Sequence, residues 1–303
     1  MVVTAVVLAS LAGVPPGLAQ DAGQSRLTGD VRFHGVGRGD TLSTLGARFG
    51  VEPRTLAVDN GLAITDVLAA GSRLRIDNRH IVPDALVAAP LVVNLPQRVA
   101  FHRNATVTAI PVAVGRPQWA TPRGSFTVVL REENPTWDVP RSILDEARRR
   151  GRTHPTRVPP GPDNPLGAFW LGLSSGSIGL HGTNAPSSIY SFASHGCVRL
   201  HPDDIAWLFP RVAVGDRVEL IYEPVLLAAV GAQVFLEVHR DPYQLAPATL
   251  ERVRELALSQ GLTDLVDWEA VRRVVRLRHG VARDVTASGV AHHPGVTPGE
   301  GHD

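Results

Sequence analysis

The most informative part of this chain reads His181-Gly182-Thr183-Asn184 and, after a short spacer, Ser194-His195-Gly196-Cys197-Val198-Arg199. Cys197 is the only cysteine, so an intramolecular disulfide is excluded. A thiol must become a thiolate before it attacks a carbonyl, and a neighbouring imidazole can take its proton and later return it to a leaving amine. The pattern therefore favours a cysteine nucleophile assisted by a histidine.

The two histidines beside this cysteine receive different assignments. His181 ends an apolar strand and begins a loop, where a rigid element presents a base to a nucleophile on a loop, so we assign it as the general base. Gly196 predicts a tight turn, and the N–H groups of Gly196 and Cys197 form a candidate oxyanion hole. His195 is assigned a structural or oxyanion-supporting role.

Two alternatives to nucleophilic catalysis are an inert thiol and a metal site. A lone cysteine can pack as a small hydrophobic side chain. His181, His195 and Cys197 resemble zinc ligands, but no fourth ligand accompanies them, so we predict no metal. His292-His293 and His302 also lack ligands at metal-binding spacing, and no cofactor is predicted.

These stretches resemble the signature of the L,D-transpeptidase catalytic (YkuD) domain, of the type found in Gram-negative periplasms. That signature is a His-Gly-Thr, a spacer and Ser-His-Gly-Cys, followed by an apolar residue and Arg or Asn, and this chain has each part. The resemblance covers residues 85–223. Further matches are Thr121-Pro122-Arg123-Gly124-Ser125-Phe126, Asn134-Pro135-Thr136-Trp137 and Asn164-Pro165-Leu166-Gly167.

The resemblance implies a mechanism and a substrate. Cys197 is then the nucleophile and His181 the base, with the backbone carbonyl of Gly182 orienting His181 in place of a carboxylate. Members of the family attack the third-residue carbonyl of a peptidoglycan stem tetrapeptide, release D-Ala and form a thioester. An amine of another stem resolves the thioester and gives a crosslink. Some relatives use a lipoprotein lysine as the acceptor, and others use water.

Four polar residues of the same stretches are candidate substrate-binding groups: Thr183, Asn184, Ser194 and Arg199. Arg199 either binds a substrate carboxylate or forms a buried ion pair that braces the loop. Ser194 fits a structural role better than a nucleophilic one, because the nearby thiol is the better attacking group at neutral pH.

The bulk composition is that of an ordinary globular protein. The chain has 303 residues and a net charge of +1, and this balance gives no support to nucleic-acid binding. The sequence contains no lysine, so no catalytic amine or Schiff base is available from a side chain. Abundant glycine and proline with few aromatic residues favour short strands joined by turns, which indicates a mainly β fold.

The N-terminus predicts export. Residues 1–19 form an apolar run of signal-peptide length that ends in small residues and is too short to span a bilayer, although a basic start is missing. A buried apolar strand is the alternative. Residues 20–33 are polar and read as a linker. We therefore predict an exported, periplasmic, wall-associated protein that does not span the membrane after signal cleavage.

Residues 34–77 predict a small βααβ unit. Val36 opens its first strand, and Gly39-Asp40-Thr41-Leu42 is a turn that caps a helix ended by Gly50. A second helix directs Leu56 and Val58 inward.

The whole unit resembles a LysM domain, which implies binding to the N-acetylglucosamine-containing glycan of peptidoglycan. A packing unit without a ligand is the alternative. The matching segments are Gly39-Asp40-Thr41-Leu42, Arg48-Phe49-Gly50-Val51, Asn60-Gly61-Leu62 and Gly71-Ser72-Arg73-Leu74.

Residues 84–223 read as the catalytic domain, an antiparallel sandwich or barrel-like arrangement of strands with a helix from Pro202 to Phe209. Within it, residues 141–163 are rich in arginine and form either a basic lid over an anionic substrate or a solvated helix with a stiff loop. The expected strands include residues 91–95, 98–101, 106–114, 126–130, 169–173, 178–180 and 217–222.

A helical extension is predicted for residues 224–283, with a strand from Gln233 to Val238 and amphipathic helices from Thr249 to Leu258 and from Leu265 to Leu277. Residues 284–303 are predicted to be a disordered tail.

Three other activities compete with transpeptidation. Carboxypeptidase action by the same site stays open. A papain-like or NlpC-type hydrolase has its cysteine before its histidine in the chain, whereas His181 precedes Cys197 here. A non-catalytic wall-binding protein would not need an intact histidine–cysteine pair.

Overall fold

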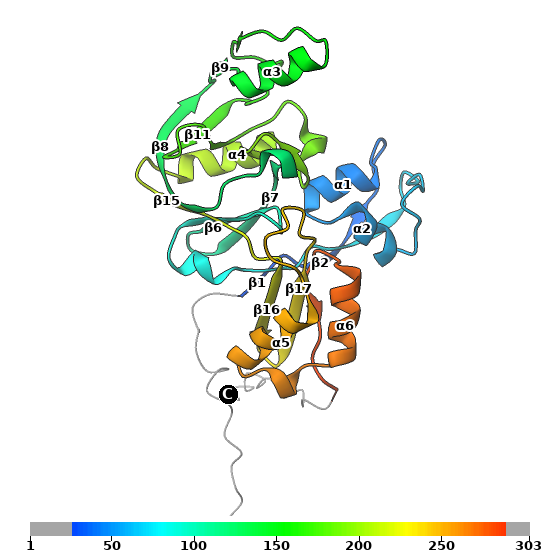
Figure 1. Cartoon of the computed structure of the whole chain (residues 1–303). Coiled ribbons are helices and arrows are strands. Elements are labelled where there is room, and N and C mark those ends of the chain that lie inside the picture. The colour runs from blue at the N-terminus through cyan, green and yellow to red at the C-terminus, as the bar shows by residue number, and fades with distance from the viewer. Residues whose placement is uncertain (1–25, 289–303) are drawn as a thin grey trace, which may run out of the picture.

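The computed structural model describes residues 26–288 and consists of three units packed against one another (Figure 1). An N-terminal unit (residues 31–77, blue) lies beside a barrel (residues 91–221, cyan to yellow), and a C-terminal unit (residues 225–286, orange) lies below both. The predicted signal peptide, residues 1–19, lies outside the described residues, as does the first part of the predicted linker.

The N-terminal unit has the predicted order of strand, helix, helix and strand. The hydroxyl of Thr41 accepts a hydrogen bond from the Thr44 N–H at 3.0 Å and so caps the first helix, as expected. Gly50 ends this helix with a φ of 69°, a left-handed conformation that favours glycine. The elements are β2 (Val31–Gly35), α1 (Leu42–Phe49), α2 (Pro53–Asp59) and β3 (Arg73–Asp77).

Two details of this unit differ from the prediction. The sequence predicts a strand opening at Val36 after a linker over 20–33, whereas β2 spans Val31–Gly35 and pairs antiparallel with β3. Val31 and Phe33 are 43% and 61% exposed, so β2 lacks the buried apolar residues that signal a strand. Val58 is exposed rather than inward, because residues two apart on a helix do not share a face and Leu56 is buried.

The barrel confirms the mainly β prediction. Its strands are β5 (Leu91–Asn94), β6 (Val99–Arg103), β7 (Val107–Gly115), β8 (Gly124–Glu133), β11 (Phe169–Leu173), β12 (Gly179–His181), β13 (Phe192–Ser194), β14 (Val198–Leu200) and β15 (Arg217–Ile221).

The sheet closes because β6 pairs with both β5 and β7. The closed order is β7-β14-β12-β11-β8-β15-β5-β6, with β13 added beside β7. Most neighbours are antiparallel, as predicted, but β12–β14, β15–β5 and β13–β7 are parallel. Parallel pairs need a crossover connection, which short apolar runs in a sequence do not reveal. The predicted helix is present as α4 (Pro202–Leu208), and its Ile205 and Leu208 are buried in the barrel core.

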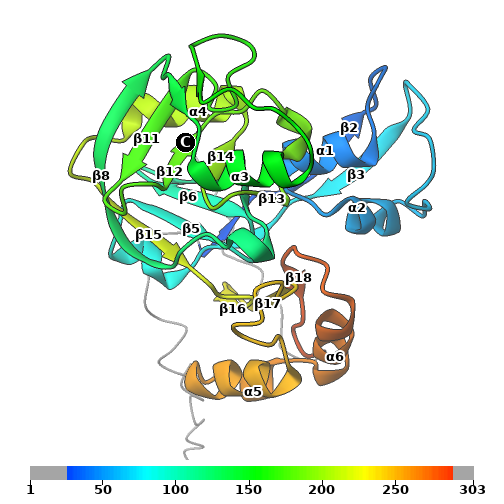
Figure 2. The same cartoon turned by 45° about the horizontal axis from the view of Figure 1, so that its top comes forward.

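Residues 137–158 form an insertion that extends from one end of the barrel. A short antiparallel pair, β9 (Trp137–Asp138) and β10 (Arg157–Val158), flanks α3 (Arg141–Arg149). In Figure 2, α3 lies in front of β12 and β14. The arginine-rich segment is therefore helical at its start.

The C-terminal unit contains the predicted strand and both predicted helices. It also contains β16, which is not among the predicted strands. The predicted disordered tail begins too early, because Val285 is buried and the Thr286 hydroxyl accepts a hydrogen bond from the Val234 N–H at 2.9 Å. A single apolar residue such as Val285 carries no periodic signal. The elements are β16 (Val225–Val230), β17 (Gln233–Val238), α5 (Leu250–Ser259), α6 (Trp268–Leu277) and β18 (Arg283–Asp284).

The N-terminal and C-terminal units share a core and an ionic cluster. Val281 packs into the apolar core of the N-terminal unit. Arg283 donates to both oxygens of Asp59 at 2.8 and 2.7 Å and to Asp77 at 3.1 Å. Asp77 is fully buried, and Arg79 also donates to it. These contacts cross from β18 to α2 and β3, and they fix the two units against each other.

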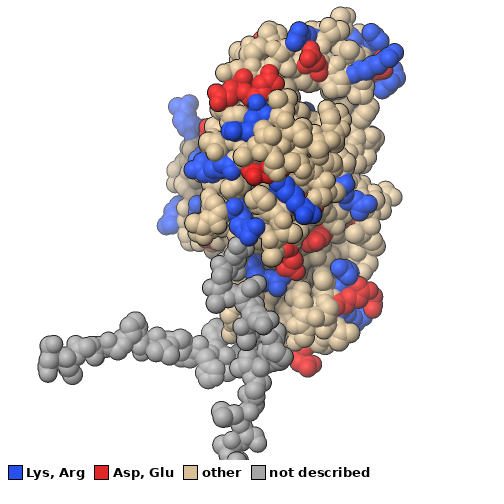
Figure 3. All heavy atoms as spheres, turned by 90° about the vertical axis from the view of Figure 1, so that its left-hand side faces the viewer, with Lys and Arg blue, Asp and Glu red and all other residues tan. Residues whose placement is uncertain are grey.

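The surface mixes both signs of charge. On the face in Figure 3, arginine and acidic side chains are interspersed rather than gathered by sign. Among residues 26–288, no helix is both long and apolar enough to cross a membrane.

Replacing Arg283 with methionine should lower the free energy of unfolding by about 3 kcal/mol, because Asp59 and Asp77 would keep their charges in a nearly buried site with one partner fewer. Urea denaturation followed by circular dichroism measures this change. Arg252→Met is the matched control, since Arg252 forms an exposed pair with Glu255 and its loss should cost less than about 1 kcal/mol. Equal losses of unfolding free energy in the two variants would contradict this role of Arg283.

Candidate active site

Two neighbouring strands bring the predicted nucleophile and base onto one face of the barrel sheet. His181 ends β12, and Cys197 immediately precedes β14. The strands are parallel, with Leu180 opposite Val198 and His181 opposite Arg199. Because alternate residues of a strand share a face, Cys197 and Arg199 lie on the same face as His181.

The His181 ring is fixed in one tautomer. Its Nδ1 lies 2.6 Å from the Gly182 carbonyl oxygen, which can only accept, so Nδ1–H donates and Nε2 carries the free lone pair. The predicted partner of His181 therefore makes this contact. Burial, reinforced by the Arg199 charge, lowers the pKa of His181 to about 3, which leaves the imidazole neutral. Trp170, opposite His181 on β11, stacks on the ring at 5.7 Å between centroids.

The Cys197 thiol is half-buried and mainly neutral at rest. Burial raises the pKa of Cys197, and the backbone of Gly179 and the charge of Arg199 oppose that rise only in part. The Sγ atom lies 3.7 Å from the Ser177 carbonyl oxygen. The site therefore holds a neutral thiol and a neutral imidazole, and the thiolate must be formed by proton transfer when it reacts.

Ser194 closes the turn that carries Cys197. Its hydroxyl donates to the Cys197 carbonyl at 2.5 Å and accepts from the Gly196 N–H at 3.1 Å, and the side chain is buried. Gly196 has a φ of 113°, and a β-carbon there would lie 3.1 Å from the Ile178 side chain. The tight turn expected at Gly196 is therefore present. Ser194 is engaged within the turn, which corresponds to the structural role rather than to substrate contact.

The two candidate oxyanion donors are not equivalent. The Gly196 N–H is already donated to Ser194, whereas the Cys197 N–H has no hydrogen-bond partner within residues 26–288. Of the two predicted donors, the Cys197 N–H is the one left available in this conformation.

Arg199 lies beside the thiol without an acidic partner. No carboxylate in the described part of the chain is within ion-pair distance of it, and its buried Nε has no hydrogen-bond acceptor. The predicted alternative of a buried bracing ion pair is therefore wrong for this conformation. Burial lowers the pKa of Arg199, and the approach of Arg116 adds to this, while Cys197 opposes it. A half-buried guanidinium without an acidic partner suits an incoming anion.

Thr183 and Asn184 are used within the protein. The buried Thr183 hydroxyl accepts from the Ala185 N–H at 3.0 Å. The exposed Asn184 donates through Nδ2 to the Asp163 carbonyl at 3.2 Å, which joins the His181 loop to the end of the arginine-rich segment. Neither residue is brought to the thiol by a contact in this structure.

His195 belongs to a polar cluster under α3 that the sequence did not predict. Its Nε2 lies 2.7 Å from the Glu146 carboxylate and also contacts the Arg116 guanidinium, and its ring lies against Trp119 at 5.4 Å. Glu146 pairs with Arg116 at 2.6 Å and with Arg150 at 2.7 Å. The His195 hydrogen bond and the arginine charges lower the pKa of Glu146 to about 2. Glu146 is one acidic residue among many arginines, so its residue type does not indicate a contact with His195.

Protein-family models match two parts of the chain. The L,D-transpeptidase catalytic domain (YkuD) matches residues 90–220, and the LysM domain matches residues 34–77. The first range spans the barrel with His181 and Cys197, and the second spans the N-terminal unit.

Whole-chain relatives agree with these matches. The chain is 34% identical over 250 residues to the probable L,D-transpeptidase ErfK/SrfK of Escherichia coli, covering 81% of this chain and 78% of that protein. It is 33% identical over 279 residues to the probable L,D-transpeptidase YcfS of Escherichia coli, covering 86% and 85%. The crystal structure of L,D-transpeptidase 3 from Mycobacterium tuberculosis is 19% identical, covers 44% of this chain and 60% of that chain, and has a TM-score of 0.35.

The chain therefore belongs to the L,D-transpeptidase family and is an enzyme of this kind, with a LysM domain at its N-terminal side.

Removing the Glu146 carboxylate should release α3 from the barrel, because Glu146 is the helix residue that bonds to His195 and Arg116. In Glu146→Ala, trypsin should cut after the arginines of residues 148–152 roughly tenfold faster than in the unaltered protein, since local opening becomes easier. Asp145→Ala is the control, because Asp145 pairs only with the exposed Arg148 of the same helix. The same rate of cleavage in both variants would show that Glu146 does not hold the segment.

Proposed function

We propose that this protein is a peptidoglycan L,D-transpeptidase in which the Cys197 thiolate attacks the third-residue carbonyl of a stem tetrapeptide. The observation that carries the proposal is the His181 tautomer. With Nδ1–H bound to the Gly182 carbonyl, Nε2 is left as a proton acceptor on the face that also bears the chain's only thiol.

The proposed acylation begins with transfer of the thiol proton to His181 Nε2 as Sγ attacks the carbonyl carbon. The oxyanion of the tetrahedral intermediate accepts from the Cys197 N–H. The imidazolium then returns its proton to the departing amine of D-Ala, and the thioester remains on Cys197. The acceptor amine next loses a proton to His181 as it attacks the thioester, which restores the free thiol and forms the new amide.

Arg199 is the proposed contact for a carboxylate of the donor peptide. It is a half-buried cation without an acidic partner in the described residues, on the face that carries Cys197 and His181. A charge-assisted hydrogen bond to an anion would satisfy its buried Nε–H and would place the donor carbonyl beside the thiol. The role of His195 in this proposal is to hold the turn through Glu146 and Arg116 rather than to take the thiol proton.

The acceptor is the second part of the proposal. An amine of another stem peptide would give a crosslink, a lipoprotein lysine would give an attached lipoprotein, and water would make the enzyme an L,D-carboxypeptidase. All three share the thioester on Cys197, so product analysis distinguishes them. A non-catalytic wall-binding protein would form no thioester.

Incubation with a disaccharide-tetrapeptide should add the acyl group to Cys197, which intact-mass spectrometry detects. Cys197→Ala should abolish the adduct, and His181→Ala should slow its formation by about a hundredfold or more, because the proton acceptor is lost. His201→Ala is the control, since His201 Nδ1 accepts from the Asp203 N–H at the start of α4, and its loss should leave the rate unchanged. Full activity in folded Cys197→Ala would refute the mechanism. Crosslinked dimers rather than simple loss of D-Ala would identify the acceptor as a stem amine.

We also propose that the LysM domain holds the protein on peptidoglycan glycan in the periplasm after export by residues 1–19. The loop between α2 and β3 supports this proposal, because Ile64 and Val67 are 54% and 95% exposed there. Apolar side chains exposed on a loop are typical of a binding surface. Their shape suits the acetamido methyl groups and sugar faces of the glycan.

Replacing both Ile64 and Val67 with serine should reduce co-sedimentation with purified sacculi while acylation by a soluble muropeptide stays unchanged. Because both side chains are exposed, the fold should be preserved. Leu258→Ser is the control, since Leu258 is equally exposed on α5 of the C-terminal unit. Unchanged sedimentation of the double variant would remove this loop from the glycan surface. Substitution is preferable to deletion of the domain, because Thr55 and Asp59 bind the C-terminal unit.

A further inference from the structure

Three ligand-type side chains meet in the interior where the three units join. His80 lies on β4 (His80–Ile81), between the N-terminal unit and the barrel, and Glu237 and His239 lie at the end of β17. Their side chains are 3%, 0% and 1% exposed. His80 Nδ1 lies 2.7 Å and His239 Nε2 lies 2.8 Å from the same oxygen, Oε1 of Glu237.

The hydrogen bond of His80 Nε2 does not account for the close contact between His80 Nδ1 and Glu237 Oε1. His80 Nε2 lies 3.0 Å from the Gly50 carbonyl, which can only accept, so Nε2 carries the hydrogen. In the neutral ring, Nδ1 then presents a lone pair to a carboxylate oxygen 2.7 Å away. Two acceptors at that distance repel each other, so a proton or a metal cation must lie between them.

The other two groups point toward the same place. Glu237 Oε2 accepts from the Ile81 N–H at 2.6 Å, so this oxygen is already satisfied and Oε1 alone faces both rings. His239 Nε2 lies 2.8 Å from this Oε1, while its buried Nδ1 has no hydrogen-bond partner among residues 26–288.

We propose that His80 Nδ1, Glu237 Oε1 and His239 Nε2 bind a divalent transition-metal ion of the zinc type. Two imidazoles and one carboxylate are ligands that zinc prefers, and they leave a fourth position for water. The three atoms lie within 4.8 Å of one another. Tetrahedral ligands at zinc bond lengths are about 3.3 Å apart. Each ring nitrogen therefore needs to move only about half an ångström away from Glu237 Oε1.

The surroundings of the triad match those of metal sites. Ligating histidines usually donate their second N–H to a carbonyl, as His80 does to Gly50, and ligating carboxylates are usually held by a second hydrogen bond, as Glu237 is by Ile81. These contacts orient both ligands before an ion arrives. They also connect the site to the C-terminal end of α1, because Gly50 is the residue that ends that helix.

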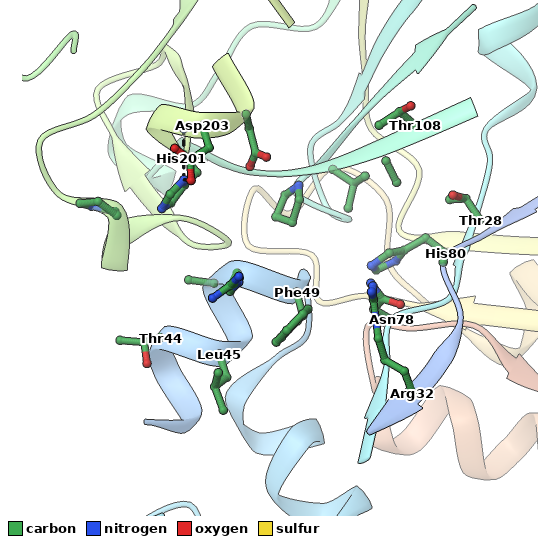
Figure 4. A pocket seen from close by; sticks show the side chains of 18 of the residues that line it. Thr28, Arg32, Thr44, Leu45, Phe49, Asn78, His80, Thr108, His201 and Asp203 are labelled. Carbon is green, nitrogen blue, oxygen red and sulfur yellow. Dashed lines mark hydrogen bonds and ion pairs between the residues drawn. The ribbon is translucent and has the colours of Figure 1, made fainter. Parts of the chain in front are cut away.

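A cleft provides the entry path. A cavity of about 760 Å³ lies between α1 and the barrel, and His80 is part of its wall. Figure 4 shows the His80 imidazole at this wall, near Phe49 and Asn78. His80 is the ligand of the three that lines this cleft. The bound ion would join β4 to the C-terminal unit, and Gly50 of the N-terminal unit holds one of its ligands.

The test uses the full chain in a background of Cys197→Ser with His292, His293 and His302 each changed to alanine, purified without a histidine tag. These changes remove the catalytic thiol and the histidines near the C-terminus as competing ligands. Cobalt(II) is the spectroscopic probe and zinc the competitor. We expect one equivalent of cobalt to give visible d–d absorption of a low-coordinate site, and one equivalent of zinc to remove it.

His239→Gln in this background should weaken cobalt binding by at least about tenfold. His102→Gln is the matched control, because His102 is also buried but lies beside Trp207 with no carboxylate partner, and it should bind as the background does. If His239→Gln fails to fold, the background protein alone tests the metal site. Its cobalt spectrum should show the site, and zinc should raise its melting temperature in a way that a chelator reverses. Absence of tight binding of one equivalent of cobalt to the folded background protein would overturn the proposal. Neither outcome depends on the acylation of Cys197.

Discussion

The parallel pairing of β12 with β14 is the constraint on which the active site depends. Residues 182–197, which include β13, separate these strands in the chain, and in the sheet β14 lies between β12 and β7. The pairing sets His181 opposite Arg199 and so fixes which residues share a face with Cys197. A shift of one residue in this register would turn Cys197 to the opposite face from His181.

In the proposed mechanism, the backbone supplies groups that side chains supply in other cysteine enzymes. The Gly182 carbonyl orients His181 in place of a carboxylate, and a β-carbon on Gly182 would lie 3.2 Å from the Leu166 carbonyl oxygen and 3.3 Å from the Ile205 side chain. A carbonyl brings no negative charge to stabilise an imidazolium. Burial then leaves His181 neutral, and the Arg199 charge strengthens the effect. The resting site is thus a neutral pair, and charge separates only when a substrate supplies polar groups of its own.

Much of this could be predicted from the sequence, because the relevant signals are local. The turn at Gly196, the cap at Thr41 and the helices of the C-terminal unit each depend on residues close together in the chain. The parts that could not be predicted depend on distant residues. The Glu146–His195 bond joins residues 49 positions apart, and the Arg283–Asp59 pair joins residues 224 positions apart. The start of β2 could not be predicted for a different reason. Its apolar side chains, Val31 and Phe33, face outward, so the sequence predicts a strand that opens only at Val36.

The roles proposed for the two histidines beside Cys197 follow from their hydrogen-bond partners rather than from their distance to Cys197 in the sequence. His195 is the nearer in the chain, but it is only partly buried, and its Nε2 faces a carboxylate and a guanidinium. A proton transferred to that nitrogen would meet the Arg116 charge and would compete with an existing hydrogen bond. His181 is sixteen residues from Cys197 in sequence, yet no hydrogen bond joins its Nε2 to another group of residues 26–288, and its ring is held by Gly182 and Trp170. A base needs a lone pair in a fixed direction near the nucleophile, and in the proposed mechanism His181 Nε2 offers one on the face that carries Cys197.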